Sequence, residues 1–172
     1  PRGPYPLLAI SGQQGAAKST TARVLRALID PSRSLLRTTP REERDLMISA
    51  NAGWVLAFDN LSSLPQWLSD AFCRLATGGG FSTRELYSND EETLFDAMRP
   101  VLFTSIEDVV LIGDLVDRGI RLHLPAIEEA ARKPEATFWK EFESARPRIL
   151  GALLDTVSAA LKNLPDVHLD KS

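Results

Sequence analysis

Cysteine, histidine and long hydrophobic runs are scarce in this chain of 172 residues, which has one cysteine and two histidines. The single cysteine, Cys73, excludes an internal disulfide framework and a cysteine-rich zinc site. No apolar run approaches the roughly 20 residues that span a bilayer, so we expect no membrane contact. The chain also lacks a basic excess. Its net charge of −3 argues against coating nucleic acid through bulk charge, but leaves room for a local basic patch.

The rest of the composition is that of an ordinary globular protein. Hydrophobic residues make up 44% of the chain and charged residues 25%, which excludes wholesale disorder and fits one domain with a small appendage. The sequence begins with Pro1 rather than Met and runs into an apolar segment without a recognisable leader. We therefore expect a cytoplasmic domain excised from a longer protein.

Five short apolar runs alternate with segments of helical periodicity, notably 19–29, 41–50 and 64–76. This alternation predicts an α/β fold, in which helices cover both faces of a five-stranded, mostly parallel sheet. All of the runs but the second read as buried strands. The five expected strands are 7–11, 34–38, 54–58, 100–104 and 120–124.

Two segments fall outside this alternation. Residues 81–98 follow three glycines and predict a β-hairpin inserted before the fourth strand, with arms at 82–87 and 93–97 and a tip at 88–92. The end of the chain is helical in pattern, with expected interruptions at Pro134 and Pro147. We therefore divide the chain into a core at 1–125 and a helical lid or tail at 126–172.

A phosphate-binding loop is the strongest motif. Residues 12–19 (GQQGAAKS) match G-x-x-x-x-G-K-[ST] at every fixed position except Ala17. Backbone N–H groups of such a loop surround phosphates, the lysine (Lys18) reaches the β- and γ-phosphates, and the Ser19 hydroxyl completes the coordination of Mg²⁺.

The context fits this motif, because an expected strand leads into the loop and an expected helix leads out. The alternative to a phosphate-binding loop is a glycine-rich turn with an exposed lysine that matches the motif by chance. Ala17 should matter little, because the chain is entering a helix there and alanine suits a helix. The residues expected to contact ATP are Gly12, Gln13, Gln14, Gly15, Ala16, Ala17, Lys18, Ser19 and Thr20.

A carboxylate follows the third expected strand. Asp59 is expected to hold Mg²⁺ together with Ser19, because a carboxylate at the end of an apolar strand is costly unless a cation or hydrogen-bond donors face it. The alternative is that Asp59 caps the next turn. The next residue, Asn60, stands where many ATPases have a glutamate that polarises water. An amide orients water but cannot take its proton, so slow hydrolysis is one expected outcome.

Beyond these two motifs, the chain resembles AAA+ ATPases, in particular the superfamily 3 helicase-like branch found in phage and plasmid primase–helicases. The resemblance covers about residues 5 to 125. The loop GQQGAAKS, with alanine before lysine, is similar to that of the minichromosome maintenance helicases. The other segments that carry it are GGGFSTRELY at 78–87, RPVLFTS at 99–105 and GDLVDR at 113–118.

The resemblance implies a three-layer P-loop NTPase that hydrolyses Mg-ATP as the core of a helicase-like motor in phage or prophage DNA replication. It implies a sensor role for Thr104 or Ser105, the alternative being a simple strand-end hydroxyl. It also implies that Arg118 is an arginine finger reaching the γ-phosphate of a neighbour in a ring such as a hexamer. An ordinary salt bridge with Asp114 or Asp117 is the alternative for Arg118.

DNA is a less secure partner than ATP. The expected hairpin tip carries Asp90, Glu91 and Glu92, which repel a phosphate backbone, and the net charge lends DNA no support. Two other functions therefore stay open, an ATP-controlled switch or assembly protein with weak hydrolysis and a P-loop kinase. His123 reads as a structural residue rather than a metal ligand.

Overall fold

The computed structural model describes residues 4–84, 92–106 and 114–167. The chain divides into two compact units, Pro1–Ile127 and Glu128–Ser172. Within its described residues, the first unit holds a parallel sheet of four strands in the order β2–β5–β1–β6. These strands are β1 (Leu7–Ser11), β2 (Leu56–Leu61), β5 (Val101–Ser105) and β6 (Gly119–His123). The accompanying helices are α1 (Lys18–Ile29), α2 (Glu43–Ala52), α3 (Gln66–Thr77) and α4 (Asp114–Arg118).

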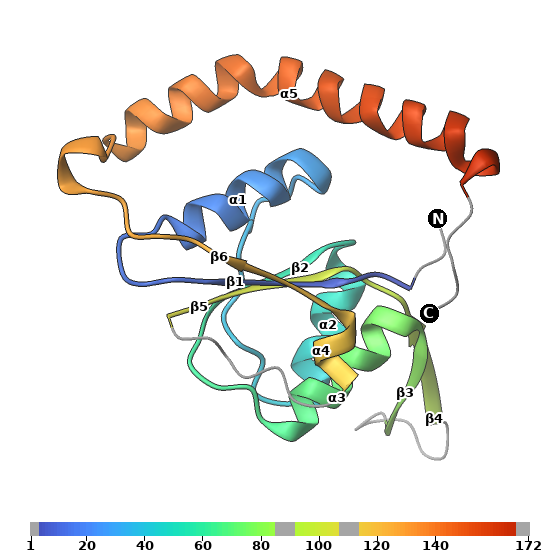
Figure 1. Ribbon diagram of the computed structural model, residues 1–172. Coiled ribbons are helices and arrows are strands. Elements are labelled where there is room, and N and C mark those ends of the chain that lie inside the picture. Colours follow the sequence, from blue (N-terminus) through green and yellow to red (C-terminus); the bar gives the residue numbers. More distant parts are fainter. Residues whose placement is uncertain (1–3, 85–91, 107–113, 168–172) are drawn as a thin grey trace. The chain divides into compact units, whose positions relative to one another are not determined.

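Helices cover both faces of this sheet, with α1 on one side and α2, α3 and α4 on the other (Figure 1). The strands alternate accordingly, because successive side chains of a strand point to opposite faces. Ile10 and Ala57 pack in the cluster that includes Ala22 of α1. Leu56 and Phe58 belong to the larger cluster with α2 and α3. Continuous apolar runs in the sequence thus correspond to strands buried on both faces.

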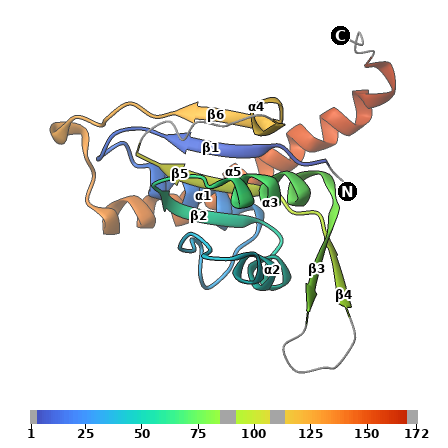
Figure 2. The same cartoon turned by 90° about the horizontal axis from the view of Figure 1, so that it is seen from below.

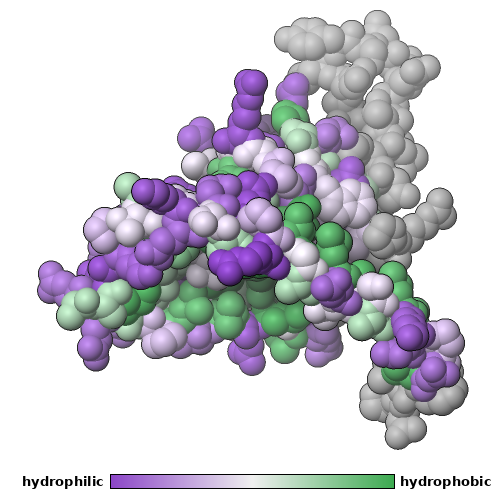
Figure 3. All heavy atoms as spheres, turned by 90° about the horizontal axis from the view of Figure 1, so that it is seen from above, coloured by the Kyte–Doolittle hydropathy of each residue, from purple (hydrophilic) through white to green (hydrophobic). Residues whose placement is uncertain are grey.

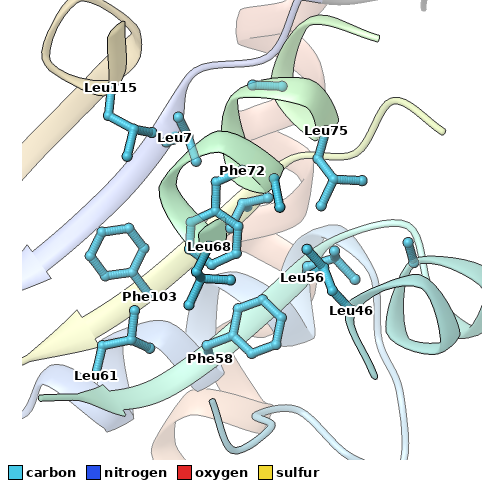
Figure 4. Packing of buried hydrophobic residues seen from close by; sticks show 14 of the residues in the cluster. Leu7, Leu46, Leu56, Phe58, Leu61, Leu68, Phe72, Leu75, Phe103 and Leu115 are labelled. Atoms are coloured by element: carbon cyan, nitrogen blue, oxygen red, sulfur yellow. The ribbon is translucent and has the colours of Figure 1, made fainter. Parts of the chain in front are cut away.

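The larger core is built around three stacked phenylalanines (Figure 4). The ring of Phe72, on α3, lies 5.7 Å from that of Phe58 and 6.0 Å from that of Phe103, measured between centroids. All three side chains are fully buried. Offset aromatic pairs at this spacing add roughly 0.5–1.5 kcal/mol beyond the burial of their area. The stack fixes α3 on β2 and β5, the two strands whose carboxyl ends carry Asp59 and Thr104.

Two of the five expected strands differ from expectation. Residues 34–38 form one isolated parallel bridge, between Arg37 and Phe58, instead of a strand. The expected fifth strand exists as β6, but it is not buried: Ile120 is 55% exposed and Leu122 38%. β6 lies at the edge of the sheet and, among the described strands, pairs only with β1. Its position at the edge leaves its side chains exposed, and this position cannot be inferred from the apolar composition of the segment.

A separate two-stranded antiparallel sheet precedes β5. It consists of β3 (Gly79–Arg84) and β4 (Glu92–Ala97), with Gly79 opposite Ala97 and Arg84 opposite Glu92 (Figure 2). The pairing lies where the sequence predicts the arms of an inserted hairpin. The segment joining the two strands, which contains Asp90 and Glu91 of the predicted tip, lies outside the described residues.

The second unit consists mainly of α5 (Glu135–Asn163), flanked by short 3₁₀ helices at Glu129–Ala131 and Leu164–Asp166. The predicted interruption at Pro147 is wrong, because α5 continues through this proline. A proline inside a helix removes one backbone hydrogen bond and bends the helix without having to end it, and α5 is drawn as a bowed helix (Figure 1).

Several apolar side chains of α5 are exposed to solvent. Other parts of the surface are also hydrophobic, as the green residues on the face drawn in Figure 3 show. Among the described helices, none combines the length and the apolar character that crossing a membrane requires. The exposed apolar residues of α5 are Ile149, Leu150, Leu153, Leu154, Val157 and Leu161.

The Asp30 carboxylate ties the end of α1 to the segment that leads into β2. Arg26 is 2% exposed and donates a hydrogen bond to Asp30, which also accepts the N–H groups of Trp54 and Val55, each at 2.8 Å. Burial acts to raise the pKa of Asp30, but the hydrogen bond from Val55, the Arg26 guanidinium and the hydrogen bond from Trp54 together lower this pKa below its ordinary value. The Asp30 carboxylate is therefore a structural anchor.

Candidate functional site

The candidate site lies at the carboxyl ends of the parallel strands, where the loop 12–17 joins β1 to α1. This loop has three residues with positive φ, namely Gly12 (151°), Gly15 (84°) and Ala17 (56°). Backbone of this kind turns successive N–H groups toward a common point and is typical of loops that hold anions. The helix then begins at Lys18, with its N-terminus at the loop.

Gly12 is required by a close approach of main chain. A Cβ atom built on Gly12 would lie 2.4 Å from the carbonyl oxygen of Leu124. The chain leaving β6 crosses the loop here, because Leu124 N–H donates to Ser11 O at 2.9 Å and Ile127 N–H donates to Gly15 O at 3.3 Å. The first glycine of the motif is therefore needed for packing, because a side chain would collide with the main chain at Leu124.

Ala17 corrects one expectation. It precedes the helix in the left-handed conformation, with φ 56° and ψ 27°, rather than in helical backbone. A non-glycine residue in this region costs roughly 1–2 kcal/mol. The glycine that the motif prefers at this position therefore has a conformational reason, and the loop is folded here in spite of the alanine.

Lys18 closes the loop with its own side chain. Its Nζ donates hydrogen bonds to the carbonyl oxygens of Gly12, at 2.7 Å, and Gln13, at 2.9 Å. The N–H of Ala16 donates to the same Gln13 oxygen at 3.2 Å. The ammonium group thus lies at the mouth of the loop, in contact with acceptors that an anion could replace.

A β-bulge places Asp59 in the site. The pairing of β2 with β5 shifts between Phe58 and Leu61, so that Asp59 and Asn60 together lie opposite Thr104. Asn60 has φ 57°, a left-handed value that asparagine tolerates better than most residues. Its N–H donates to Thr104 Oγ1 at 2.8 Å, which fixes the bulge.

Three predicted site residues meet at the Asp59 carboxylate. The Ser19 hydroxyl donates to Asp59 Oδ1 at 2.8 Å, and the Thr104 hydroxyl donates to the same oxygen at 2.5 Å. Within the described residues, the Asp59 side chain has no ion-pair partner. The carboxylate is half-buried, and the side-chain donors that hold it in the described part of the chain are neutral hydroxyls. Its negative charge therefore stays available to a cation.

The donor set fits Mg²⁺ bound together with phosphates. One carboxylate and one hydroxyl are hard oxygen ligands, and Mg²⁺ is usually bound by one or two such groups plus water and substrate phosphate. A self-sufficient metal cage would need more: the described residues contain no group of three or more histidine, cysteine, aspartate or glutamate side chains that could hold a metal ion. Ser19 and Asp59 would hold the cation, with Lys18 beside them.

Other predicted residues are not brought into this cluster by their side chains. The Asn60 side chain is exposed, and only its backbone joins the network. Arg118 ends α4 and precedes Gly119, which pairs with Leu7 at the start of β1, whereas Ser11 pairs with His123 at the other end. Arg118 therefore lies at the opposite end of the strands from the loop of its own chain.

The sequence did not indicate one contact beside the loop. Ser11 Oγ and His123 Nδ1 lie 3.1 Å apart, at hydrogen-bonding distance, although 112 positions separate them in the chain. Their register in adjacent strands β1 and β6 produces this contact. The sequence alone could not predict this contact, because no motif links the two residues and the contact depends on β6 lying next to β1.

Comparisons with known proteins identify the family of this chain. Residues 1–169 match the family of actinomycete integrative conjugative element replication proteins. No curated protein matches the chain. A similar solved structure is the crystal structure of JCV helicase with an acetamide compound bound, at 14% identity and a TM-score of 0.48. The similarity covers 73% of this chain and 37% of the helicase chain. Since the family match spans nearly the whole sequence, the chain belongs to the actinomycete integrative conjugative element replication proteins.

Proposed function

We propose that the first unit binds Mg-ATP at loop 12–19 and hydrolyses it as the core of a helicase-like AAA+ motor in replication of the element. The observation that carries this proposal is the meeting of Ser19 and Thr104 on Asp59, next to a loop whose carbonyls hold Lys18. A hydroxyl from the helix N-terminus and a carboxylate from a second strand of the sheet are the two protein ligands that P-loop NTPases give to Mg²⁺. The family name supports a role in replication.

Each residue then has a role that follows from its position. The loop N–H groups and Lys18 bind the phosphates, and Lys18 exchanges the Gly12 and Gln13 carbonyls for phosphate oxygens. Ser19 and Asp59 hold Mg²⁺, which neutralises charge on the phosphates when bound. Thr104, fixed between Asp59 and the Asn60 N–H, is in place to orient a water molecule or a γ-phosphate oxygen.

The proposal includes a ring of subunits. Arg118 is separated from the loop of its own chain by the length of β6, since Gly119 pairs with Leu7 and His123 with Ser11. Four residues of strand span about 13 Å. An arginine so placed cannot complete its own site, but it can complete that of a neighbour, where a guanidinium typically accelerates hydrolysis by 10³-fold or more.

A switch with weak hydrolysis is the second candidate, and Asn60 favours it. The Asn60 amide side chain is exposed beside Asp59 and cannot accept a proton from water. Hydrolysis without a strong base is slow, so ATP binding alone could control assembly. A P-loop kinase is the third candidate, and a phosphorylated acceptor instead of free phosphate as the product would favour it.

Calorimetric titration of the full chain with Mg-ATP tests the binding site. We expect binding by the native chain and a loss of at least about 100-fold in affinity for Lys18→Ala, because a charge-assisted contact to phosphate is removed. Lys140→Ala is the matched control, since Lys140 is an exposed lysine of α5. No binding by a folded native sample at millimolar Mg-ATP would refute the proposal.

Phosphate release separates a motor from a switch. A motor should release phosphate at a rate that rises with protein concentration and with single-stranded DNA, and Arg118→Ala should remove the rise with concentration. A switch should bind ATP with slow release that DNA does not change. Unchanged turnover of Arg118→Ala at concentrations where rings form would contradict the finger role.

A further inference from the structure

An apolar stripe runs along the carboxyl-terminal half of helix α5. Successive residues of a helix are rotated by about 100° about its axis, which places the six side chains of the stripe within an arc of about 100°. All six are exposed, from 39% for Leu150 to 64% for Leu161. Leu164 prolongs the stripe beyond the last helical residue, because its backbone keeps right-handed helical angles, φ −53° and ψ −38°. The stripe consists of Leu150, Leu153, Leu154, Val157, Leu161 and Leu164.

The charged residues within 148–166 lie on the other side of the helix. Arg148, Asp155 and Lys162 are exposed and fall within an arc of about 40°, centred opposite the stripe. Asp166 follows in the 3₁₀ turn, so positive and negative charges balance. A helix that lies on a lipid surface usually has a polar face rich in lysine and arginine. The balanced polar face of α5 therefore argues against a lipid surface as the occupant of the stripe.

The spacing of the apolar residues is symmetric about Val157. Each large residue of the stripe has an apolar counterpart at the same distance on the other side of Val157. Two identical helices that run antiparallel, related by a twofold axis at Val157, bring such counterparts together at one height. Leucine then meets leucine in four layers, and a leucine meets a small alanine in two, as interdigitating layers require. The counterparts are Leu153 with Leu161, Leu150 with Leu164, and Leu154 with Ala160.

We propose that this stripe is an interface between two copies of the chain, which pair their α5 helices antiparallel about a twofold axis at Val157. A twofold contact uses the same patch on both copies, so a stripe with this symmetry can cover itself. The contact lies within the second unit and does not rest on the ATP site. It also closes with two copies, and is therefore distinct from a ring contact that brings Arg118 to a neighbour.

The exposed area is sufficient for such a contact. The six side chains of the stripe together expose on the order of 600 Å² in each copy, so pairing buries on the order of 1,200 Å², where specific interfaces begin. Ile149 and Val167, which are 37% and 53% exposed, border the stripe along one side and add to this area. Removal of apolar area from water is the main driving force of such association.

Sedimentation velocity of the full chain without nucleotide tests the stripe. We expect the native chain to form a dimer at about 50 µM, and Val157→Lys to weaken the dimer at least about 100-fold, because two ammonium groups would meet at the axis without a partner. Val157 is 54% exposed, so the change carries little risk to folding. Asp155→Lys introduces the same residue on the polar face and should dimerise like the native chain. Equal dimerisation of Val157→Lys and Asp155→Lys would overturn the proposal.

Two further variants test the orientation of the helices. Leu150→Lys and Leu164→Asp should each weaken the dimer when studied alone, because a charge then faces a leucine. In an equal mixture, the antiparallel pair places the new lysine of one copy opposite the new aspartate of the other and keeps the leucine pair at the other end. We expect the mixed dimer to be at least about 10-fold tighter than either variant alone. A parallel pair would show no recovery, and absence of recovery would overturn the antiparallel arrangement.

Calorimetry with Mg-ATP separates this proposal from the proposed function, because Val157→Lys should bind Mg-ATP like the native chain whether or not that function is correct in its other parts. Association that is lost in Arg118→Ala but kept in Val157→Lys would belong to the ring and would overturn the stripe as an interface. A native chain that stays monomeric at about 50 µM would also overturn it, and binding of that monomer to lipid vesicles would assign the stripe to a membrane surface.

Discussion

Two carboxylates at opposite ends of the parallel sheet differ in what neutralises them. At the end where the strands begin, Asp30 binds the buried Arg26 and two backbone N–H groups. At the carboxyl end, the hydrogen-bond donors to the Asp59 carboxylate among the described residues are the hydroxyls of Ser19 and Thr104. The same helix, α1, contributes to both, since it carries Ser19 in its first turn and Arg26 in its last.

This difference in neutralisation indicates that Asp30 stabilises the fold, whereas Asp59 is suited to bind a cation. A carboxylate paired with a buried guanidinium has its charge compensated within the protein, and removing either partner is costly. A carboxylate held by hydroxyls has its orientation fixed but its charge uncompensated, which is the state a metal site needs before its cation arrives. Helix α1 therefore carries a residue of the candidate site, Ser19, at its N-terminal end and a residue that stabilises the fold, Arg26, at its C-terminal end.

The largest expected effect comes from Asp30→Asn. This change keeps the size of the side chain but leaves Arg26, which is 2% exposed, buried without its counter-charge. We expect a loss of about 3 kcal/mol in the free energy of unfolding, measured by urea denaturation. A loss below about 1 kcal/mol would contradict the anchoring role.

Acid should weaken the same anchor. The pKa of Asp30 is lowered in the folded chain, so its contribution is fully present above the pKa of the unfolded chain, about 3.9. The contribution is lost as the pH falls from there through the lowered folded pKa. Urea midpoints measured from pH 6 to pH 2 should therefore converge for native and Asp30→Asn chains at the acid end.

The matched change at the other end, Asp59→Asn, should reverse the pattern. We expect turnover of Mg-ATP to fall by about 100-fold, because the carboxylate ligand of the cation is lost. The free energy of unfolding should change by less than about 1 kcal/mol, since the amide oxygen still accepts the Ser19 and Thr104 hydroxyls. Phosphate release and urea denaturation on one preparation measure both, and a large loss of stability with unchanged turnover would mean that Asp59 is a second anchor.

Thr104→Val should affect both properties moderately. The change removes the acceptor of the Asn60 N–H and the donor to Asp59 at almost constant shape. A backbone N–H left without a partner costs roughly 1–3 kcal/mol, so we expect about 1–2 kcal/mol lower stability together with slower turnover. Thr104→Ser keeps the hydroxyl and serves as the control: if it matches Thr104→Val in turnover, the hydroxyl has no part in the site.

The smallest effect is expected for Ala17→Gly in the phosphate loop. The left-handed backbone at this position strains alanine but not glycine, while glycine costs more entropy on folding. We expect a net gain of up to about 1 kcal/mol in the free energy of unfolding, with ATP affinity retained. A clear loss of stability would show that position 17 needs its Cβ for packing.

Motifs with a fixed spacing could be read from the sequence because their chemistry is local. The loop 12–19 predicted the turn between β1 and α1, and the apolar run 54–58 predicted that Asp59 lies at the end of a strand, whereas the role of Thr104 came from the family resemblance. Features that depend on distant pairing could not be read in this way. The bulge at Asp59 and Asn60 exists only because β2 pairs with β5, and the Ser11–His123 contact exists only because β6 lies next to β1.

Local propensity also misled at three places. Ala17 reads as a helix former but precedes the helix in left-handed backbone, and Pro147 reads as a helix end although α5 continues through it. The apolar run at 120–124 reads as a buried strand but lies at the sheet edge. In each case the neighbours in space outweigh the preference of the residue. The assignments of ATP, Mg²⁺ and the ring stay predictions that the experiments above address.

The narrow space above Gly12 has an evolutionary consequence. Because a side chain there would collide with the main chain at Leu124, no single substitution at position 12 can be accommodated by a rotamer change nearby. Drift at this position would require a compensating displacement of the chain leaving β6. Related sequences should therefore either keep glycine at this point or differ in both segments together.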